Sequence, residues 1–431
     1  MTIHRLSIAQ LQSAYASETL TPLAVTHHYL ARIAAHDPTL RAYVALHTRA
    51  LADAANPPPG PLHGVPLAIK SNIDVAGLVT TAGIEARRTV LPTTADAPIV
   101  ARLRAAGAII LGHVNMNEAA VGATTDNEAY GRTMNPHRIG HTPGGSSGGS
   151  GAAVAAGLCV AALGTDTLGS VRIPAAYNGI YGLKPTRGLV DDAGLVPLSH
   201  ALDAIGPLAR SIDDLALVMA AMADLAPAEP VTKVALLDVV DRIEIERPVR
   251  QGYDLAASLL RGLDLATQDY AFDIDLTRVR LGALVPALVE GRAYFAANLM
   301  NNPEGFTSSL RALFDFAAKA TPEARAKGSA EVARAVSSLH AILADADAIL
   351  LPTTPHAAPA HGDLRVSAAD FTGLANIAGL PALSLPAGWS NDGLPVAVQL
   401  IGRAGGEATL LDLARRLDGV MKGYAPPPEF A

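Results

Sequence analysis

Apolar and polar positions follow two patterns along this chain, one with the spacing of a helix and one typical of strands. Residues 22–35 carry apolar side chains at helical spacing, with Thr21 available as N-cap and Pro22 at the first helical position. Residues 98–106 repeat this pattern and lead into an apolar run at 108–114. Helices that alternate with buried strands are typical of an α/β fold.

Further apolar runs of strand length recur over the rest of the chain. They span residues 65–70, 158–163, 180–184, 233–238, 348–352, 382–386 and 394–401. Residues 148–157 are rich in alanine and glycine, which predicts a tightly packed helix. Between residues 243 and 346 the pattern becomes mostly helical, and we interpret this stretch as a helical insertion with the potential to shape a substrate entrance.

Composition and charge narrow the class of partner. Half of the 431 residues are hydrophobic and only 17% are charged, which suits a large buried core. The formal net charge is −7 and no basic block occurs, so there is no electrostatic reason to expect direct binding to nucleic acid or to an anionic membrane. The partner is therefore expected to be a small molecule.

The single cysteine and the N-terminus bear on the cellular compartment. Cys159 lies in an apolar run and has no second cysteine to pair with, so we expect a buried, inert thiol. The N-terminal residues lack the continuous apolar stretch of a signal peptide. The longest run of small apolar residues, 151–164, is too short to span a bilayer. These features predict a soluble, cytoplasmic protein.

Residues 144–151 hold five glycines and three serines, and such a loop can expose backbone N–H groups and hydroxyls to one point. It has no lysine after its last glycine and does not fit G-x-G-x-x-G spacing, which disfavours phosphate binding. Residues 144–148 match G-x-S-x-G, but the preceding residues 135–143 contain two prolines instead of a strand. An α/β-hydrolase elbow is therefore disfavoured, and we interpret the loop as a site of acyl chemistry.

Lys70 and Ser170 extend this interpretation. Lys70 ends the apolar run 65–70, and ligands of open α/β sheets bind beyond the carboxyl ends of strands, although a surface lysine is the alternative. A lysine can activate a serine when burial or a nearby cation lowers its pKa. Ser170 follows the turn 167–169, whose N–H groups could stabilise an oxyanion, and Pro174 can start a helix whose positive end faces the same point.

Other candidate groups carry weaker signals. Four histidines could suggest a Ser–His pair, but none lies in a triad context; they are His113, His137, His141 and His200. The sequence has no H-E-x-x-H motif and no Cys/His cluster, which disfavours a metal site. Tyr130 could contact a substrate, although an ordinary packed tyrosine is the simpler interpretation.

Two motifs and their flanks carry a resemblance to a known family. The pattern G-G-S-S-G-G-S at residues 144–150 is followed about two dozen residues later by G-T-D-T-L-G-S-V-R-I-P-A at 164–175. Flanking matches lie at residues 64–70, 182–186, 202–207, 378–382 and 393–402. The chain resembles the amidase signature family nearly end to end, most weakly from 230 to 346.

Carried over to this sequence, the resemblance implies a Ser-cisSer-Lys triad. Ser170 is the nucleophile, Ser146 bridges through a cis peptide after Gly145, and Lys70 is the base. Neutral Lys70 draws a proton through Ser146 from Ser170, which attacks the amide carbonyl, and water then cleaves the acyl-enzyme. The implied oxyanion donors are the backbone N–H groups of Thr167, Leu168, Gly169 and Ser170. Possible supporting residues are Ser147, Asp166 and Arg172.

The resemblance also implies a fold and a set of partners. It implies one α/β domain over residues 1–431, a single large α/β/α sandwich whose mixed central sheet is covered by helices on both faces. We place the motif core at about 60–210, the helical insertion at about 243–346 and the C-terminal sheet strands at about 347–402. A small-molecule amide substrate, no cofactor, no metal and a possible homodimer complete the expectation.

Two positions depart from the family pattern. Leu168 stands where glycine is usual, so a branched side chain enters or flanks the acyl pocket; some allophanate-type hydrolases of the family also lack that glycine, which hints at a compact substrate. Asn72 stands where aspartate commonly follows the lysine motif. An asparagine close to Lys70 would raise the pKa of that lysine less than an aspartate would.

Several functions fit these motifs. The first is a stand-alone amidohydrolase of a small amide, and a hydrolase of a ureido compound such as allophanate or carboxybiuret is a variant of it. The second is the amidase subunit of a glutamine-dependent tRNA amidotransferase, whose pattern of Asn-Glu followed by Tyr-Gly is shared at residues 127–131. The third, a silent binding or assembly protein, is disfavoured by the intact Lys70, Ser146 and Ser170.

Overall fold

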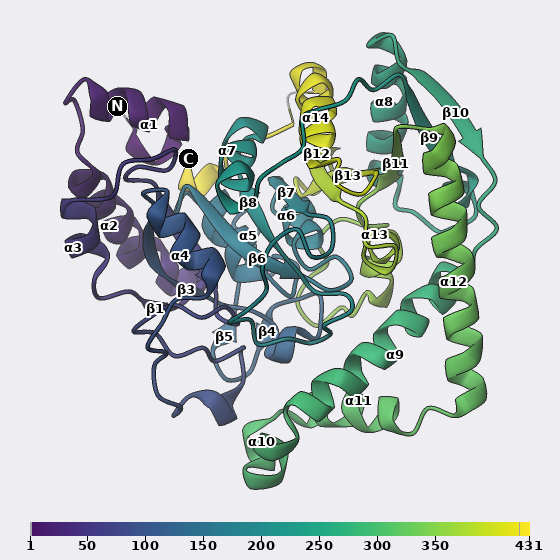
Figure 1. Cartoon of the computed structure of the whole chain (residues 1–431), viewed down its shortest axis with the longest axis horizontal. Helices are drawn as coiled ribbons and strands as arrows, with labels where there is room; N and C mark the ends of the chain where they lie inside the picture. The colour runs from purple at the N-terminus through teal and green to yellow at the C-terminus, as the bar shows by residue number, and fades with distance from the viewer. Residues whose placement is uncertain (1, 422) are drawn as a thin grey trace.

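The computed structural model describes residues 2–421 and 423–431, and an eleven-stranded mixed sheet forms its centre (Figure 1). The strand order is β1-β3-β2-β6-β8-β7-β12-β13-β11-β9-β10. These strands are β1 (Tyr43–Leu46), β2 (Pro66–Lys70), β3 (Ile109–Val114), β6 (Ala161–Asp166), β7 (Tyr181–Lys184), β8 (Ala204–Ala209), β9 (Lys233–Leu237), β10 (Ala266–Tyr270), β11 (Ala348–Pro352), β12 (Ala382–Trp389) and β13 (Pro395–Gly402). A separate two-stranded sheet pairs β4 (Asp126–Asn127) with β5 (Gly131–Arg132).

Fourteen α-helices surround the sheet in the described part of the chain. They are α1 (Ile8–Ala16), α2 (Pro22–Leu40), α3 (Ala50–Ala55), α4 (Pro98–Ala105), α5 (Gly148–Ala155), α6 (Arg172–Tyr177), α7 (Ile212–Met222), α8 (Arg247–Gly262), α9 (Leu276–Tyr294), α10 (Ala296–Asn301), α11 (Ser308–Ala318), α12 (Pro322–Asp345), α13 (Gly373–Ile377) and α14 (Glu407–Met421). As expected from the sequence, Thr21 caps α2 by accepting a hydrogen bond from Ala24 N, and Pro22 is its first residue.

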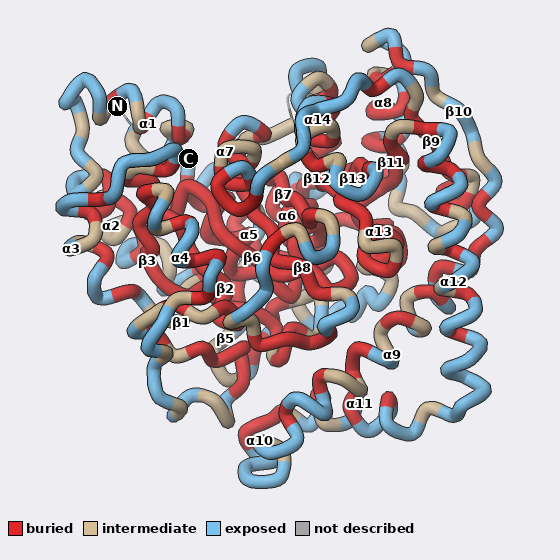
Figure 2. The backbone as a smooth tube through the Cα atoms, viewed as in Figure 1, coloured by how far each residue is buried: buried red, intermediate tan, exposed pale blue. Residues whose placement is uncertain are grey.

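Helices cover both faces of the sheet. Helices α5 and α6 contact each other, and between them they lie against β2, β6, β7 and β12. Helices α7, α8 and α14 form a second connected group, which contacts β7, β8, β12 and β13. The most deeply buried backbone lies in the central strands and in α5 and α6 (Figure 2). The predicted α/β/α sandwich with a mixed sheet is therefore confirmed.

The strands near the centre point in both directions, and this decides which residues meet at one edge. Strands β2, β3 and β6 are parallel to one another, whereas β8 is antiparallel to β6. The carboxyl ends of β2 and β6 therefore lie at the same edge as the amino end of β8. Lys70, Asp166 and Ala204 are the residues that stand there.

Helix α5 explains the run of glycines and alanines that precedes β6. All eight of its residues are buried, and Gly149 lies so close to Asn115 that a Cβ would overlap with the Asn115 backbone. Only the smallest side chains allow this approach. The helix therefore brings residues 144–147, directly before it, against the end of β3.

Residues 243–346 contribute to two different parts of the molecule. Helix α8 packs on β12 and β13, and β10 pairs in parallel with β9, so both belong to the main sheet and its cover. Helices α11 and α12 each pack on α9, and the three extend beside the sandwich (Figure 1). The mostly helical pattern is confirmed, but the sequence missed β10, and the domain limits stay a prediction.

Other differences from the sequence-based expectations are local. The run 158–163 is displaced to β6 (Ala161–Asp166), because Leu158 N still donates back to Ala153 O in the turn that ends α5. Helix α6 begins at Arg172, two residues before Pro174. Cys159 is buried, as expected, and burial raises the pKa of its thiol to about 12. Within the described residues, no helix is both long enough and apolar enough to cross a bilayer.

Candidate active site

Lys70 lies at the carboxyl end of β2, with its side chain buried beneath the glycine-rich loop. Its Nζ donates to Ser146 Oγ at 2.7 Å and to Thr165 Oγ1 at 2.6 Å, and Thr165 O lies at 3.4 Å. The whole residue is 0% exposed. These three acceptors match the three donors of an ammonium group, so the amine is held in one orientation.

Burial controls the protonation of this amine. It lowers the pKa of Lys70 from 10.5 to about 7, while the charges of Asp203 and Asp166 act in the opposite direction. A large fraction of Lys70 is therefore neutral near pH 7. A neutral amine can accept a proton from the hydroxyl of Ser146, which an ordinary surface lysine could not do at this pH.

Ser146 and Ser147 stand between the loop and β6. The peptide bond between Gly145 and Ser146 is cis, as the family resemblance implied. Ser147 Oγ donates to Thr165 O and accepts from Thr165 N, both at 3.2 Å, so its hydroxyl fastens the loop to β6. Ser147 N donates to Ser170 O at 3.2 Å, which joins the two serine-containing turns directly.

Ser170 lies in the turn between β6 and α6 and is 8% exposed, whereas Lys70 and Ser146 are fully buried. It is thus the one of these three residues that a ligand can reach from outside. No hydrogen bond joins the hydroxyls of Ser146 and Ser170 within the described residues. Hydrogen bonds between reacting groups are often longer before substrate is bound, and the hydrogen bond from Ser147 N to Ser170 O already holds the two turns together.

Asp166 organises the turn that carries Ser170. Its carboxylate accepts hydrogen bonds from Gly169 N at 2.7 Å and Val171 N at 3.1 Å, and it forms a fully buried ion pair with Arg172 at 3.0 Å. Burial by itself raises the pKa of Asp166, but the charge and hydrogen bonds of Arg172 outweigh this and hold the pKa at about 2. Asp166 and Arg172 therefore act as a scaffold for the turn.

The contact from Asp166 changes the expectation for the oxyanion donors. Because Gly169 N already donates to a carboxylate, it is not a free donor in this structure. The backbone N–H groups of Thr167, Leu168 and Ser170 have no acceptor among the described residues. Leu168 itself is 9% exposed, and its carbonyl accepts from Thr372 Oγ1 at 2.7 Å, so its side chain lies beside α13.

Sequence reasoning missed Thr165 and Asn117. Thr165 Oγ1 accepts a hydrogen bond from Lys70 Nζ and a second, at 3.3 Å, from Asn72 Nδ2. Asn72 and the lysine amine therefore share one acceptor. Asn117 N donates to Ser146 O at 3.0 Å, and a Cβ on Gly145 would overlap with Asn117 Oδ1. Thr165 lies inside the second motif, which was the available signal; nothing in the sequence marks Asn117.

The other candidates lie apart from this cluster. His113 is buried and contacts the carbonyls of Ile73 and Val79, and His137 contacts the carbonyl of Asn178. Tyr130 is partly buried beneath Arg88, whose guanidinium lies 4.6 Å from the ring centroid. In residues 2–421 and 423–431, no three His, Cys, Asp or Glu side chains are grouped so as to hold a metal ion.

Comparison with known proteins places these motifs in context. The family model described as Amidase matches residues 24–258 and 295–411, which is most of the chain. The chain belongs to the amidase family. Its members include enzymes and enzyme subunits that act on amide C–N bonds, and this chain is an enzyme of that kind.

Three relatives illustrate the range of the family. A glutamyl-tRNA(Gln) amidotransferase subunit of Thermus thermophilus is 36% identical, over 94% of this chain and 95% of the relative. The AtzE subunit of the 1-carboxybiuret hydrolase of Pseudomonas sp. is also 36% identical, over 81% of this chain and 82% of that protein. A chain in the solved, inhibitor-bound structure of a vestigial protein complex, described as revealing the evolutionary origins of an s-triazine catabolic enzyme, has a TM-score of 0.89 and 31% identity, covering 98% of this chain and 99% of the other.

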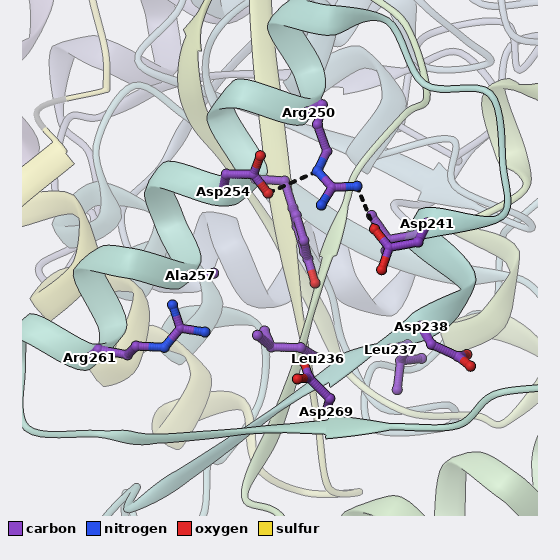
Figure 3. Close-up of a pocket in the computed structure, with 11 residues that line it drawn as sticks. Leu236, Leu237, Asp238, Asp241, Arg250, Asp254, Ala257, Arg261 and Asp269 are labelled. Atoms are coloured by element: carbon purple, nitrogen blue, oxygen red, sulfur yellow. Dashed lines mark hydrogen bonds and ion pairs between the residues drawn. The ribbon is translucent and has the colours of Figure 1, made fainter.

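A cavity elsewhere on the molecule provides a contrast. About 440 Å³ of space lies between α8, β9 and β10 (Figure 3). In the strand order of the sheet, β9 and β10 are far from β6. Arg250 there bridges Asp241 at 2.5 Å and Asp254 at 2.8 Å. Four aspartates and two arginines line the cavity, and no lysine or serine does, so it lacks the lysine and serine hydroxyls of the candidate active site.

Proposed function

We propose that the chain hydrolyses a small amide through an acyl-enzyme on Ser170, with Lys70 as the base and Ser146 as the proton relay. The observation that carries this proposal is the buried contact of 2.7 Å between Lys70 Nζ and Ser146 Oγ. A lysine in this position, with a pKa of about 7, can take up and return one proton at neutral pH.

The reaction proceeds in two balanced halves. Neutral Lys70 accepts the proton of Ser146 as Ser146 accepts that of Ser170, and Ser170 Oγ forms a bond to the amide carbon. The proton then returns along the same path to the amine, the C–N bond breaks, and ammonia or an amine leaves. Water enters, gives a proton to the relay, cleaves the ester and restores Ser170.

The oxyanion of each tetrahedral intermediate needs donors that are already in place. The backbone N–H groups of Thr167, Leu168 and Ser170 are the ones we assign, since Gly169 N donates to Asp166. The turn keeps its shape through Asp166 and Arg172 rather than through the substrate. Donors that are fixed before the reaction stabilise the charge without reorganisation at the moment of bond formation.

The test is to trap the nucleophile and measure ammonia release. A fluorophosphonate should label Ser170, and Ser170→Ala should abolish both labelling and turnover. Lys70→Ala should abolish turnover, and its circular dichroism spectrum should match that of wild type, which shows that the fold is kept. Labelling at Ser146 instead would reverse the roles of the two serines, and equal turnover by wild type and Ser170→Ala would refute the enzyme mechanism.

The relatives favour two substrate classes that the same site could serve. One is glutamine within a tRNA amidotransferase, and the other is a ureido compound, of which 1-carboxybiuret is an example. A panel of aliphatic, aryl, dicarboxylic and ureido amides, assayed with the isolated chain, separates them: glutaminase activity that needs partner subunits indicates the first, and ureido turnover by the chain alone the second. The cytoplasmic location and possible homodimer stay predictions.

A further inference from the structure

Asp203 is a buried carboxylate that joins the turn carrying the nucleophile to the next loop. It immediately precedes β8, and because Asp166 pairs with Ala204, the antiparallel register brings Asp203 opposite Thr167. Asp203 Oδ1 accepts from Thr167 Oγ1 at 2.5 Å. Its other oxygen, Oδ2, accepts from Leu198 N at 2.8 Å and Ser199 N at 3.1 Å.

We propose that Asp203 is a positioning residue that fixes the turn of Ser170 through Thr167 and places a negative charge near Lys70, whose Nζ binds Thr165, two residues before Thr167. This inference rests on the function proposed above, in which Lys70 gains a positive charge as it removes the proton. Asp203 is only 7% exposed, so its carboxylate acts across protein rather than across water.

The distribution of charge around Lys70 singles out Asp203. Asp166 also faces the amine, but Arg172 neutralises it in a buried ion pair. His113, on the neighbouring strand β3, is uncharged at neutral pH because burial lowers its pKa to about 4. Helix α5 contributes no titratable side chain. Asp203 forms no ion pair within the described residues. Burial raises the pKa of its carboxyl group, while the hydrogen bonds from Thr167, Ser199 and Leu198 and the charge of Lys70 favour the ionised form.

Two opposing influences therefore set the strength of the base. Burial favours the neutral amine, whereas the Asp203 charge favours the protonated one, and the second influence grows in importance when Ser170 loses its proton to the relay. Without Asp203, Lys70 would remain neutral to lower pH but would be a weaker proton acceptor. The residue thus affects the rate and the pH profile together.

The variant Asp203→Asn separates the charge from the geometry. The amide oxygen can accept from the N–H groups of Leu198 and Ser199, and the amide NH₂ can donate to Thr167 Oγ1, because a hydroxyl both donates and accepts. The loop contacts are kept and the charge is lost. Thr167→Val does the opposite, since it removes the hydroxyl link at nearly constant shape and leaves the carboxylate ionised.

The experiment measures the rate of fluorophosphonate labelling of Ser170 from pH 5 to 9, which does not require the natural substrate, together with kcat and KM once a substrate is found. We expect Asp203→Asn to shift the acidic limb of the profile of labelling rate against pH to lower pH by about one unit, and to lower the maximal labelling rate. Thr167→Val should lower the rate without moving the limb. Asp214→Asn is the control. It neutralises a buried carboxylate that accepts a hydrogen bond from Ile8 N, and it should leave the acidic limb of the pH profile unchanged.

The outcomes distinguish this inference from the proposed function. One outcome is that wild type is labelled at Ser170 while Asp203→Asn has the same acidic limb in its pH profile as wild type. In that case the charge of Asp203 does not affect the pKa of Lys70, and the inference is wrong. A limb that moves in Thr167→Val as well would show that geometry, not charge, controls it. If wild type shows no pH-dependent labelling of Ser170 at all, the proposed function itself fails.

Discussion

Replacing the buried lysine by methionine should change the stability of the protein in a way that depends on pH. Lys70 has a pKa of about 7 in the folded protein, against 10.5 for an unperturbed lysine. Between these two pH values the unfolded chain binds one more proton than the folded chain, so the free energy of unfolding of wild type rises with pH. Below pH 7 both states are protonated and this dependence ends.

The magnitude follows from the size of the shift. Each pH unit in the window contributes about 1.4 kcal/mol, so wild type gains about 4 kcal/mol from this residue between pH 7 and pH 10. Lys70→Met has no such group and should lack that gain. The stability of the variant relative to wild type should therefore be about 4 kcal/mol more favourable at pH 7 than at pH 10. Loss of the contacts to Ser146 and Thr165 adds a cost that is the same at both pH values.

Urea denaturation of both proteins at pH 7, 8.5 and 10 measures this difference. All other titrating groups, including the second buried lysine, Lys184, are common to the two proteins and cancel. Lys319→Met, at an exposed position directly after α11, is the matched control for replacing a lysine by methionine. A stability difference between Lys70→Met and wild type that is constant over this range would mean that Lys70 titrates normally, and the mechanism would lose its base.

Three further predictions concern the turn and its supports. Asp166→Asn leaves the Arg172 guanidinium buried without a counter-charge and should cost about 3–5 kcal/mol of unfolding free energy in urea titrations; a loss below about 1 kcal/mol would contradict the assigned scaffold. Gly169→Ala, at a φ of +128° and against Thr372, should slow fluorophosphonate labelling strongly, and unchanged labelling would show that the turn tolerates distortion. Thr165→Val removes an acceptor that stabilises the protonated lysine more than the neutral amine, by about 1–1.5 kcal/mol, so the acidic limb of the labelling profile should move to lower pH by about one unit, and Thr165→Ser should restore it.

The sequence predicted those parts of the site that lie within one segment. The apolar run that ends at Lys70 drew attention to that residue, and the family resemblance carried by the two glycine- and serine-containing turns assigned Ser146 and Ser170. Asp203 and Thr165 acquire their roles only from the pairing of β8 with β6 and of β6 with β2. No local pattern encodes that register, so their contacts could not be predicted.

The prediction of the fold from local sequence had the same limit. The strongly apolar strands were found, whereas β8 was missed because Gly206 and Pro207 have low strand propensity. Gly206 lies so close to the carbonyl of Leu183 that a side chain would not fit, and Pro207 lies outside the pairing of β8 with β7, which involves only Leu208 and Ala209 of β8. Strand β10 was missed because four of its five positions are polar or small and none is buried. Tertiary packing overrides propensity in both strands.

Two buried lysines end strands of this sheet, and they show why a perturbed pKa does not by itself identify a base. Burial lowers the pKa of Lys184, as it does that of Lys70, to about 7. Lys184 Nζ, however, donates to the carbonyl of Pro185 at 2.7 Å, and a carbonyl has no proton to give. Lys70 Nζ instead contacts a hydroxyl, that of Ser146, in the segment that binds the backbone of Ser170. Desolvation leaves a large fraction of both amines neutral near pH 7, but only Lys70 contacts a hydroxyl that can give it a proton, as the proposed mechanism requires.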